Sequence, residues 1–156
     1  MSKHPEHLAP EAWHRFYAAE ANNRAWDLSE ACIDGSPPAE LLDAAHAAAW
    51  HWHAVGTDLH RMRSLTLLAL AHARATLGAS AWQYAETMRA FFLAKTDTPD
   101  WELALVHTVH ALAARAHGNA AAFETSCSKA RESFGAIQDP VDRDIVQKTY
   151  RLIESA

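Results

Sequence analysis

The chain has 156 residues, and its 14 lysines and arginines against 19 aspartates and glutamates give a net charge of −5 with neutral histidines. A chain of this length suits one domain, expected over residues 1–156, that folds without needing disulfides or a structural metal. The composition, 49% hydrophobic and 21% charged, excludes a disordered chain, and the lack of an apolar run of ~20 residues excludes a membrane-spanning protein.

Two helices are predicted in the amino-terminal part of the chain. The first runs from Pro10, a residue suited to a first helical turn, to about Cys32, before the Gly35–Pro38 segment breaks it. The second covers Ala39–Val55. Alanine, leucine and long polar side chains dominate both segments, and these residues favour helix because they lose little rotamer freedom there.

Capping residues mark the next three helices. Thr57 is the expected N-cap of the third helix, which ends at Gly78, and the fourth helix begins after Ser80. Thr98 is the expected N-cap of the fifth helix, with Pro99 at its first helical position.

The last two helices follow short turns. Gly118 ends the fifth helix, and the sixth is predicted from about Ala120 to Phe134. The segment Asp139–Asp142 approximates a capping box with proline at the first position and begins the seventh helix. The pattern predicts an all-α fold of about seven helices in antiparallel pairs.

An internal repeat relates helices three and four to helices five and six at an offset of 40 residues. The residues that coincide at this offset are small or apolar: Leu65 and Leu105, Ala71 and Ala111, Ala73 and Ala113, Gly78 and Gly118, Ala81 and Ala121, Ala90 and Ala130. Each glycine is expected to end a first helix, and the alanine twelve residues later is expected where the second helix approaches its partner closely.

A glycine followed twelve residues later by an alanine resembles the tetratricopeptide-repeat superfamily. The resemblance covers about Thr57–Phe134 and implies a right-handed stack of helix pairs. Arg74 and Ala114 stand where that family has a tryptophan, and the offset exceeds its usual length of about 34 residues. Segments including Ala45–Trp52 are also similar to an uncharacterised group of bacterial helical proteins, which implies a fold and no activity.

The sequence lacks the motifs of several common enzyme and nucleic-acid-binding classes. The chain contains no phosphate-binding loop, no dinucleotide-binding glycine motif, no H-E-x-x-H and no G-x-S-x-G. The only compact basic cluster, His60–Arg63, is too small for the lysine and arginine stripe that nucleic acid requires. Neither nucleic acid nor membrane is an expected partner.

The 11 histidines suggest a metal site. His107 and His110 lie three residues apart on one helix, so both can reach one ligand, and His46 on the second helix is a candidate third ligand. Glu20, expected to be partly buried, is a candidate fourth ligand or, alternatively, a general base. Neutral imidazoles with a carboxylate suit a divalent transition metal. The alternative is that these histidines are hydrogen-bonded or partly exposed and bind no metal.

Four further residues are candidates for ligand binding: Asn23 and Trp26 on the first helix, Trp50 on the second and Arg63 near the start of the third. The polar stripe beside Trp26 is typical of a pocket wall, and Arg63 could bind an anion near a helix start. The alternatives are a solvated helix face, core tryptophans and a surface ion pair.

The sequence favours a helical-repeat binding or scaffold module that recognises a peptide, a protein partner or itself. The alternative is a metal-dependent enzyme or small-molecule-binding protein with a histidine-rich site between helices. A homodimer is expected to form through the amino-terminal helix pair, whose aromatic residues suit an interface. The first seven residues contain no apolar leader segment, which favours a cytoplasmic location.

Overall fold

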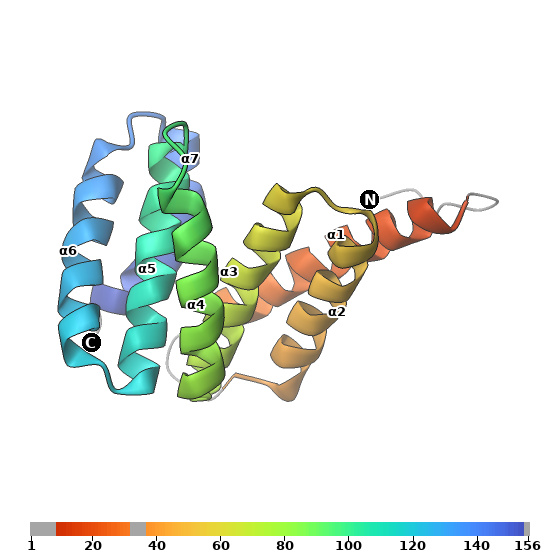
Figure 1. Cartoon of the computed structure of the whole chain (residues 1–156), viewed down its shortest axis with the longest axis horizontal. Coiled ribbons are helices and arrows are strands. Elements are labelled where there is room, and N and C mark those ends of the chain that lie inside the picture. Colours follow the sequence, from red (N-terminus) through yellow and green to blue (C-terminus); the bar gives the residue numbers. More distant parts are fainter. Residues whose placement is uncertain (1–8, 32–36, 155–156) are drawn as a thin grey trace.

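The computed structural model describes residues 9–31 and 37–154. Within these ranges the chain forms seven α-helices and no strand, as predicted (Figure 1). The helices are α1 (Pro10–Ala31), α2 (Ala39–Val55), α3 (Asp58–Arg74), α4 (Gly78–Leu93), α5 (Asp100–His117), α6 (Ala120–Ala136) and α7 (Pro140–Glu154). Cys32, the predicted end of the first helix, lies outside the described residues.

The helices pack in pairs and in two layers. α1 packs against α2, α3 against α4, and α5 against α6. The odd-numbered helices also pack against one another in order, α1 on α3, α3 on α5 and α5 on α7. In Figure 1, α7 lies behind α5, whereas α4 and α6 lie in front. The four odd helices therefore form a continuous layer, which the even helices cover on one side.

Of the three predicted N-cap residues, Thr57 and Asp139 are confirmed, and Thr98 is wrong. The Thr57 side chain accepts a hydrogen bond from the backbone N–H of His60, and Asp139 Oδ1 accepts one from the N–H of Val141 at 2.7 Å. Thr98 is not the N-cap of α5, because its hydroxyl donates to the carbonyl of Phe92 at 2.8 Å. That bond ties the turn to the end of α4, and Pro99 takes the N-cap position.

The two central helix pairs are related by 42 residues rather than by the predicted 40. α3 and α5 begin 42 residues apart, as do α4 and α6. At this offset the buried run Thr66–His72 of α3 coincides with the buried run Thr108–Ala114 of α5, and buried Phe92 coincides with buried Phe134. The structural repeat is thus longer by about half a helical turn.

Gly78 has a different role from the predicted one. The third helix ends at Arg74, and Gly78 is the first residue of α4, so the predictions that the third helix ends at Gly78 and that the fourth begins after Ser80 are wrong. Thr76, with φ of 60°, makes the left-handed turn after α3. Gly118, with φ of 81°, makes the corresponding turn after α5. A Cβ atom on Gly78 would overlap the backbone carbonyl oxygen of Ala116. Gly78 is therefore required by the close approach of α4 to the end of α5.

Because the offset is 42 rather than 40 residues, Ala90 and Ala130 do not occupy equivalent positions. Ala130 is buried in a helix contact, as predicted. Ala90 is exposed, so its predicted place in a helix contact is wrong. The position equivalent to Ala130 at the 42-residue offset is Met88, which is fully buried.

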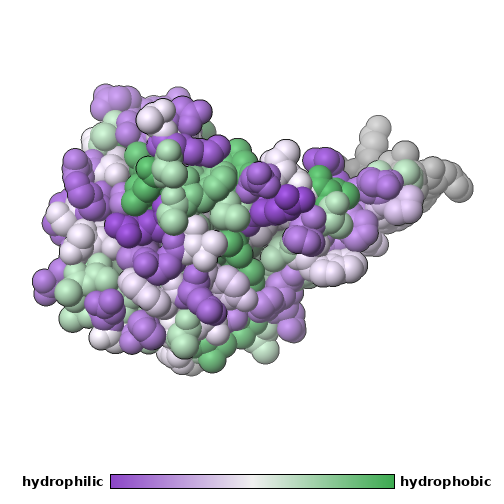
Figure 2. All heavy atoms as spheres, in the orientation of Figure 1, coloured by the Kyte–Doolittle hydropathy of each residue, from purple (hydrophilic) through white to green (hydrophobic). Residues whose placement is uncertain are grey.

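The largest core cluster lies between α3, α4 and α5 and includes Leu70, Met88, Phe92, Val109 and Leu112. On the face drawn in Figure 2, the most apolar area lies over the upper end of α4, near the turn that leads to α5. None of the helices in the described part of the chain has the length and apolar character needed to cross a membrane.

Candidate functional site

The structure does not bring the four residues of the predicted metal site together. His46 is exposed on α2, with its ring centre 5.1 Å from that of His72, and Glu20 is exposed on α1 rather than partly buried. His107 and His110 are buried on α5, which packs against α3, α4, α6 and α7, whereas α2 packs against α1 and α3. Within the described residues, no three or more histidine, cysteine, aspartate or glutamate side chains form a group that could hold a metal ion.

His110 instead joins three helices through hydrogen bonds. Its Nδ1 lies 2.7 Å from Ser126 Oγ on α6, and its Nε2 lies 2.6 Å from Glu86 Oε1 on α4. Burial lowers the pKa of His110, and the hydrogen bond to Glu86 opposes this effect. The Ser126 hydroxyl is buried. The arrangement therefore connects helices and presents no accessible nucleophile.

His107 is a buried, neutral histidine. Burial is the main cause that lowers its pKa from 6.5 to about 4, and the positive charges of Arg89 and Lys129 act in the same direction. Its Nδ1 atom is buried without a hydrogen-bond partner among the described residues. Residues such as Arg89 from α4 and Lys129 from α6 thus surround a histidine that stays uncharged at neutral pH.

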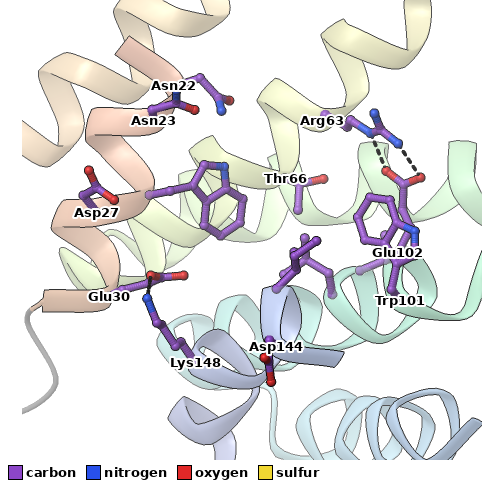
Figure 3. A pocket seen from close by; sticks show the side chains of 14 residues that line it. Asn22, Asn23, Asp27, Glu30, Arg63, Thr66, Trp101, Glu102, Asp144 and Lys148 are labelled. Carbon is purple, nitrogen blue, oxygen red and sulfur yellow. Dashed lines mark hydrogen bonds and ion pairs between the residues drawn. The ribbon is translucent and has the colours of Figure 1, made fainter. Parts of the chain in front are cut away.

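A pocket of about 470 Å³ lies on the layer of odd-numbered helices (Figure 3). Its lining comes from α1, α3, α5 and α7 and includes three of the four predicted ligand-binding residues, Asn23, Trp26 and Arg63. Trp50 is the exception, because it lies on α2, which contributes no lining residue, and 64% of its surface is exposed. Trp50 therefore lies outside this pocket, and its role in ligand binding stays a prediction.

Each odd helix contributes one stripe of its surface to the pocket. On α5 the lining residues Trp101 and Glu102 are followed one turn later by Leu105 and Val106. Residues four apart lie on the same face of a helix, so this spacing aims all of them toward one side. The lining residues of α1 and α7 follow the same spacing.

An ion pair between α3 and α5 forms one side of the pocket. Arg63 donates from Nε to Glu102 Oε1 at 2.6 Å and from Nη2 to Oε2 at 3.0 Å. Glu102 is buried, and its hydrogen bonds raise the pKa of Arg63 above its usual value. The Arg63 guanidinium also lies 5.3 Å from the centre of the Trp101 ring. Arg63 is therefore held in an ion pair with a carboxylate of the same chain. This was the alternative to the prediction that Arg63 binds an anionic ligand.

A second ion pair lies on the opposite side, where α7 meets α1 (Figure 3). Lys148 Nζ donates to Glu30 Oε2 at 3.0 Å, and this bond raises the pKa of Lys148. Asp27 and Asp144 also line the pocket and are exposed, and neither forms an ion pair within 4.0 Å with a described residue, although Asp27 interacts electrostatically with Lys148 and Arg24 at longer range. The four carboxylates outnumber the two cations, so the pocket is net negative.

The sequence alone did not identify Trp101, Glu102, Asp144 and Lys148 as site residues. The one-turn spacing on α5 and α7 was visible in the sequence, but it does not show which helix faces which. Glu30 and Lys148 are 118 positions apart, and only the packed layer brings them together.

The pocket therefore combines aromatic rings, unpaired carboxylates and two internal ion pairs from four separate helices. A concave site with a few converging polar groups is typical of ligand binding. No protein-family model, curated protein or solved structure matches this chain, so the assignment of a function depends on this geometry.

Proposed function

We propose that the protein is a helical-repeat binding module that recognises a segment of a partner protein in the pocket of its odd-numbered helices. The observation that carries the proposal is that all four odd helices contribute to one pocket. In stacked helix pairs, the residues of the open face vary without disturbing the core, and such faces serve recognition. The packing of neighbouring helices in pairs and in two layers supports a tetratricopeptide-like stack, although the 42-residue offset is longer than that family's usual repeat of about 34 residues.

The apolar lining of the pocket supports a macromolecular partner. Trp26 and Trp101 supply large aromatic surfaces, and aromatic residues are enriched among those that dominate binding energy. Ile145 on α7 also lines the pocket, and 54% of its surface is exposed. A partner that covers these three side chains removes apolar area from water, which favours association.

A small-molecule ligand is the second candidate for the same pocket. Its volume of about 470 Å³ is within the range of small-molecule sites, roughly 300–1,000 Å³. The histidine-rich enzyme has less support, because His46 lies apart from His107 and His110, and because Ser126 is buried.

Selection of peptides from a displayed random library tests the proposal. Ile145→Ala is expected to weaken a selected peptide by about fivefold to tenfold, because part of a buried isoleucine contributes about 1–1.5 kcal/mol. Val141→Ala is the matched control, because Val141 is 68% exposed on the same helix and does not line the pocket. Equal effects of the two substitutions, or failure to select any peptide, would contradict the proposal.

We also propose that two copies associate through α1 and α2. The amino-terminal turns of α1 extend beyond the rest of the helices (Figure 1). The Trp13 and Tyr17 rings stack there with centres 5.7 Å apart, and Tyr17 and Trp50 are 46% and 64% exposed. Light scattering at high micromolar concentration is expected to give the mass of a dimer, and Trp50→Ala is expected to lower it. A strictly monomeric mass would contradict this interface.

We propose a cytoplasmic location. Cys127 is half-buried and its thiol is free. Burial raises the pKa of this thiol, which disfavours the reactive thiolate. Thiols stay reduced in the reducing environment of the cytoplasm, so a free thiol supports this location.

A further inference from the structure

We infer that the pocket of the odd-numbered helices selects a lysine or arginine side chain of the partner segment. The inference rests on the proposed function and specifies the chemistry of the occupant. It follows from the charges in the pocket, from its aromatic walls and from the way its own cations are held.

The uncompensated charge in the pocket is negative. Glu102 is neutralised by Arg63 and Glu30 by Lys148, whereas neither Asp27 nor Asp144 forms an ion pair within 4.0 Å among the described residues. Asp27 also interacts electrostatically with Lys148 and Arg24 at longer range, but both of these cations are already bound to glutamates. Asp27 comes from α1 and Asp144 from α7. Figure 3 shows the two carboxylates at different edges of the pocket, and both are exposed, so a cation can reach either of them without any rearrangement of the helices.

The aromatic walls suit a cation as well. A guanidinium or ammonium group is attracted to the face of a tryptophan ring within about 6 Å. Trp101 already makes such a contact, with the Arg63 guanidinium 5.3 Å from the ring centre. Trp26 lines the pocket from α1, as Asp27 does, so this helix supplies both an indole ring and a carboxylate. The alkyl part of a lysine or arginine also packs well on such rings.

An anionic ligand does not fit this arrangement. Both cations of the pocket, Arg63 and Lys148, are already bound to carboxylates, at 2.6 Å and 3.0 Å. An anion would have to displace Glu102 or Glu30 and then meet the unpaired aspartates. The net charge of −5 adds a long-range field that attracts basic partners and repels acidic ones.

Peptide selection on the full chain, followed by calorimetry, tests the inference. Selected peptides are expected to be enriched in lysine or arginine, and replacing the shared lysine by norleucine, or the shared arginine by citrulline, should weaken binding by about tenfold. The double variant Asp27→Asn with Asp144→Asn should cause a loss of similar size. The matched control, Asp43→Asn with Asp97→Asn, changes the net charge equally at exposed positions outside the pocket. It should change the affinity by less than about twofold.

Three outcomes separate the inference from the function on which it rests. Basic peptides that lose affinity only in the Asp27 and Asp144 variant support both. Neutral or acidic peptides that still depend on Ile145 would overturn the inference and leave the proposed function standing. Peptides that bind without dependence on any pocket residue, or no selected peptide at all, would overturn both.

Discussion

His107 is the residue whose environment has the clearest consequence for stability. Its pKa is about 4 in the folded chain, against a usual 6.5 that applies when the chain is unfolded. Below pH 6.5 the unfolded chain therefore binds a proton that the folded chain does not. The contribution of His107 to the free energy of unfolding should fall as the pH drops from about 6.5 to about 4, by up to roughly 3 kcal/mol, and this contribution should change no further below that range.

Urea unfolding of the parent and of His107→Leu at several pH values measures this contribution. Other histidines with lowered pKa, such as His46 and His110, contribute to the pH dependence of both proteins. The difference between the two therefore isolates His107, whose neighbours on α4 and α6 include Arg89, Lys129 and Glu132. The leucine variant should lose less stability in acid. Parallel curves for the two proteins would show that His107 does not carry the effect.

The ion pair between Arg63 and Glu102 lines the pocket and also links α3 to α5. Arg63→Ala leaves the buried Glu102 carboxylate without its partner, which should lower the free energy of unfolding by about 1–3 kcal/mol. The lower part of this range applies because nearly half of the Arg63 side chain is in contact with water.

Chemical denaturation of Arg63→Ala, of Glu102→Gln and of the double variant measures the coupling between them. Adding Glu102→Gln to Arg63→Ala should restore part of the stability, since the amide removes the unpaired buried charge. Strictly additive losses would mean that the two side chains do not act as a pair.

At the scale of helices, the 42-residue offset predicts opposite outcomes for two matched alanines. Ala130→Leu should overpack the contact between α5 and α6 and lower the free energy of unfolding by about 1–3 kcal/mol. Ala90→Leu should change it by less than about 0.5 kcal/mol, because Ala90 is exposed. Thermal unfolding of both variants measures the difference. Equal losses would favour the 40-residue offset.

The helices were predictable because their signals are local. The caps at Thr57 and Asp139 depend on residues two or three positions away. The repeat offset was harder to predict, because the left-handed turn after α3 is made by Thr76 rather than by a glycine. Gly78, the obvious marker in the sequence, is needed instead for the contact with Ala116. Aligning the two glycines therefore gave an offset two residues too short.

At the scale of the whole molecule, site residues could be predicted from the sequence only where they share one face of a single helix. Asn23 and Trp26 belong to a single polar and aromatic stripe, and the structure places both in the pocket. The predicted metal site was not supported, because its candidate histidines lie on helices, α2 and α5, that do not pack against each other. His107 and His110 share a face of α5, but His46 is on a helix that packs elsewhere, and the sequence carries no signal for that packing.

The chain offers a direct way to locate binding, because its 6 tryptophans are separate reporters. Trp26 and Trp101 line the pocket, whereas Trp50 lies on α2. The measurement is a titration with a selected peptide, followed through the indole N–H signals in a heteronuclear correlation spectrum. A pocket on the odd-numbered helices predicts that the signals of Trp26 and Trp101 shift together and saturate at one peptide per chain. Shifts confined to Trp50 and its neighbours, with Trp26 and Trp101 unchanged, would contradict it.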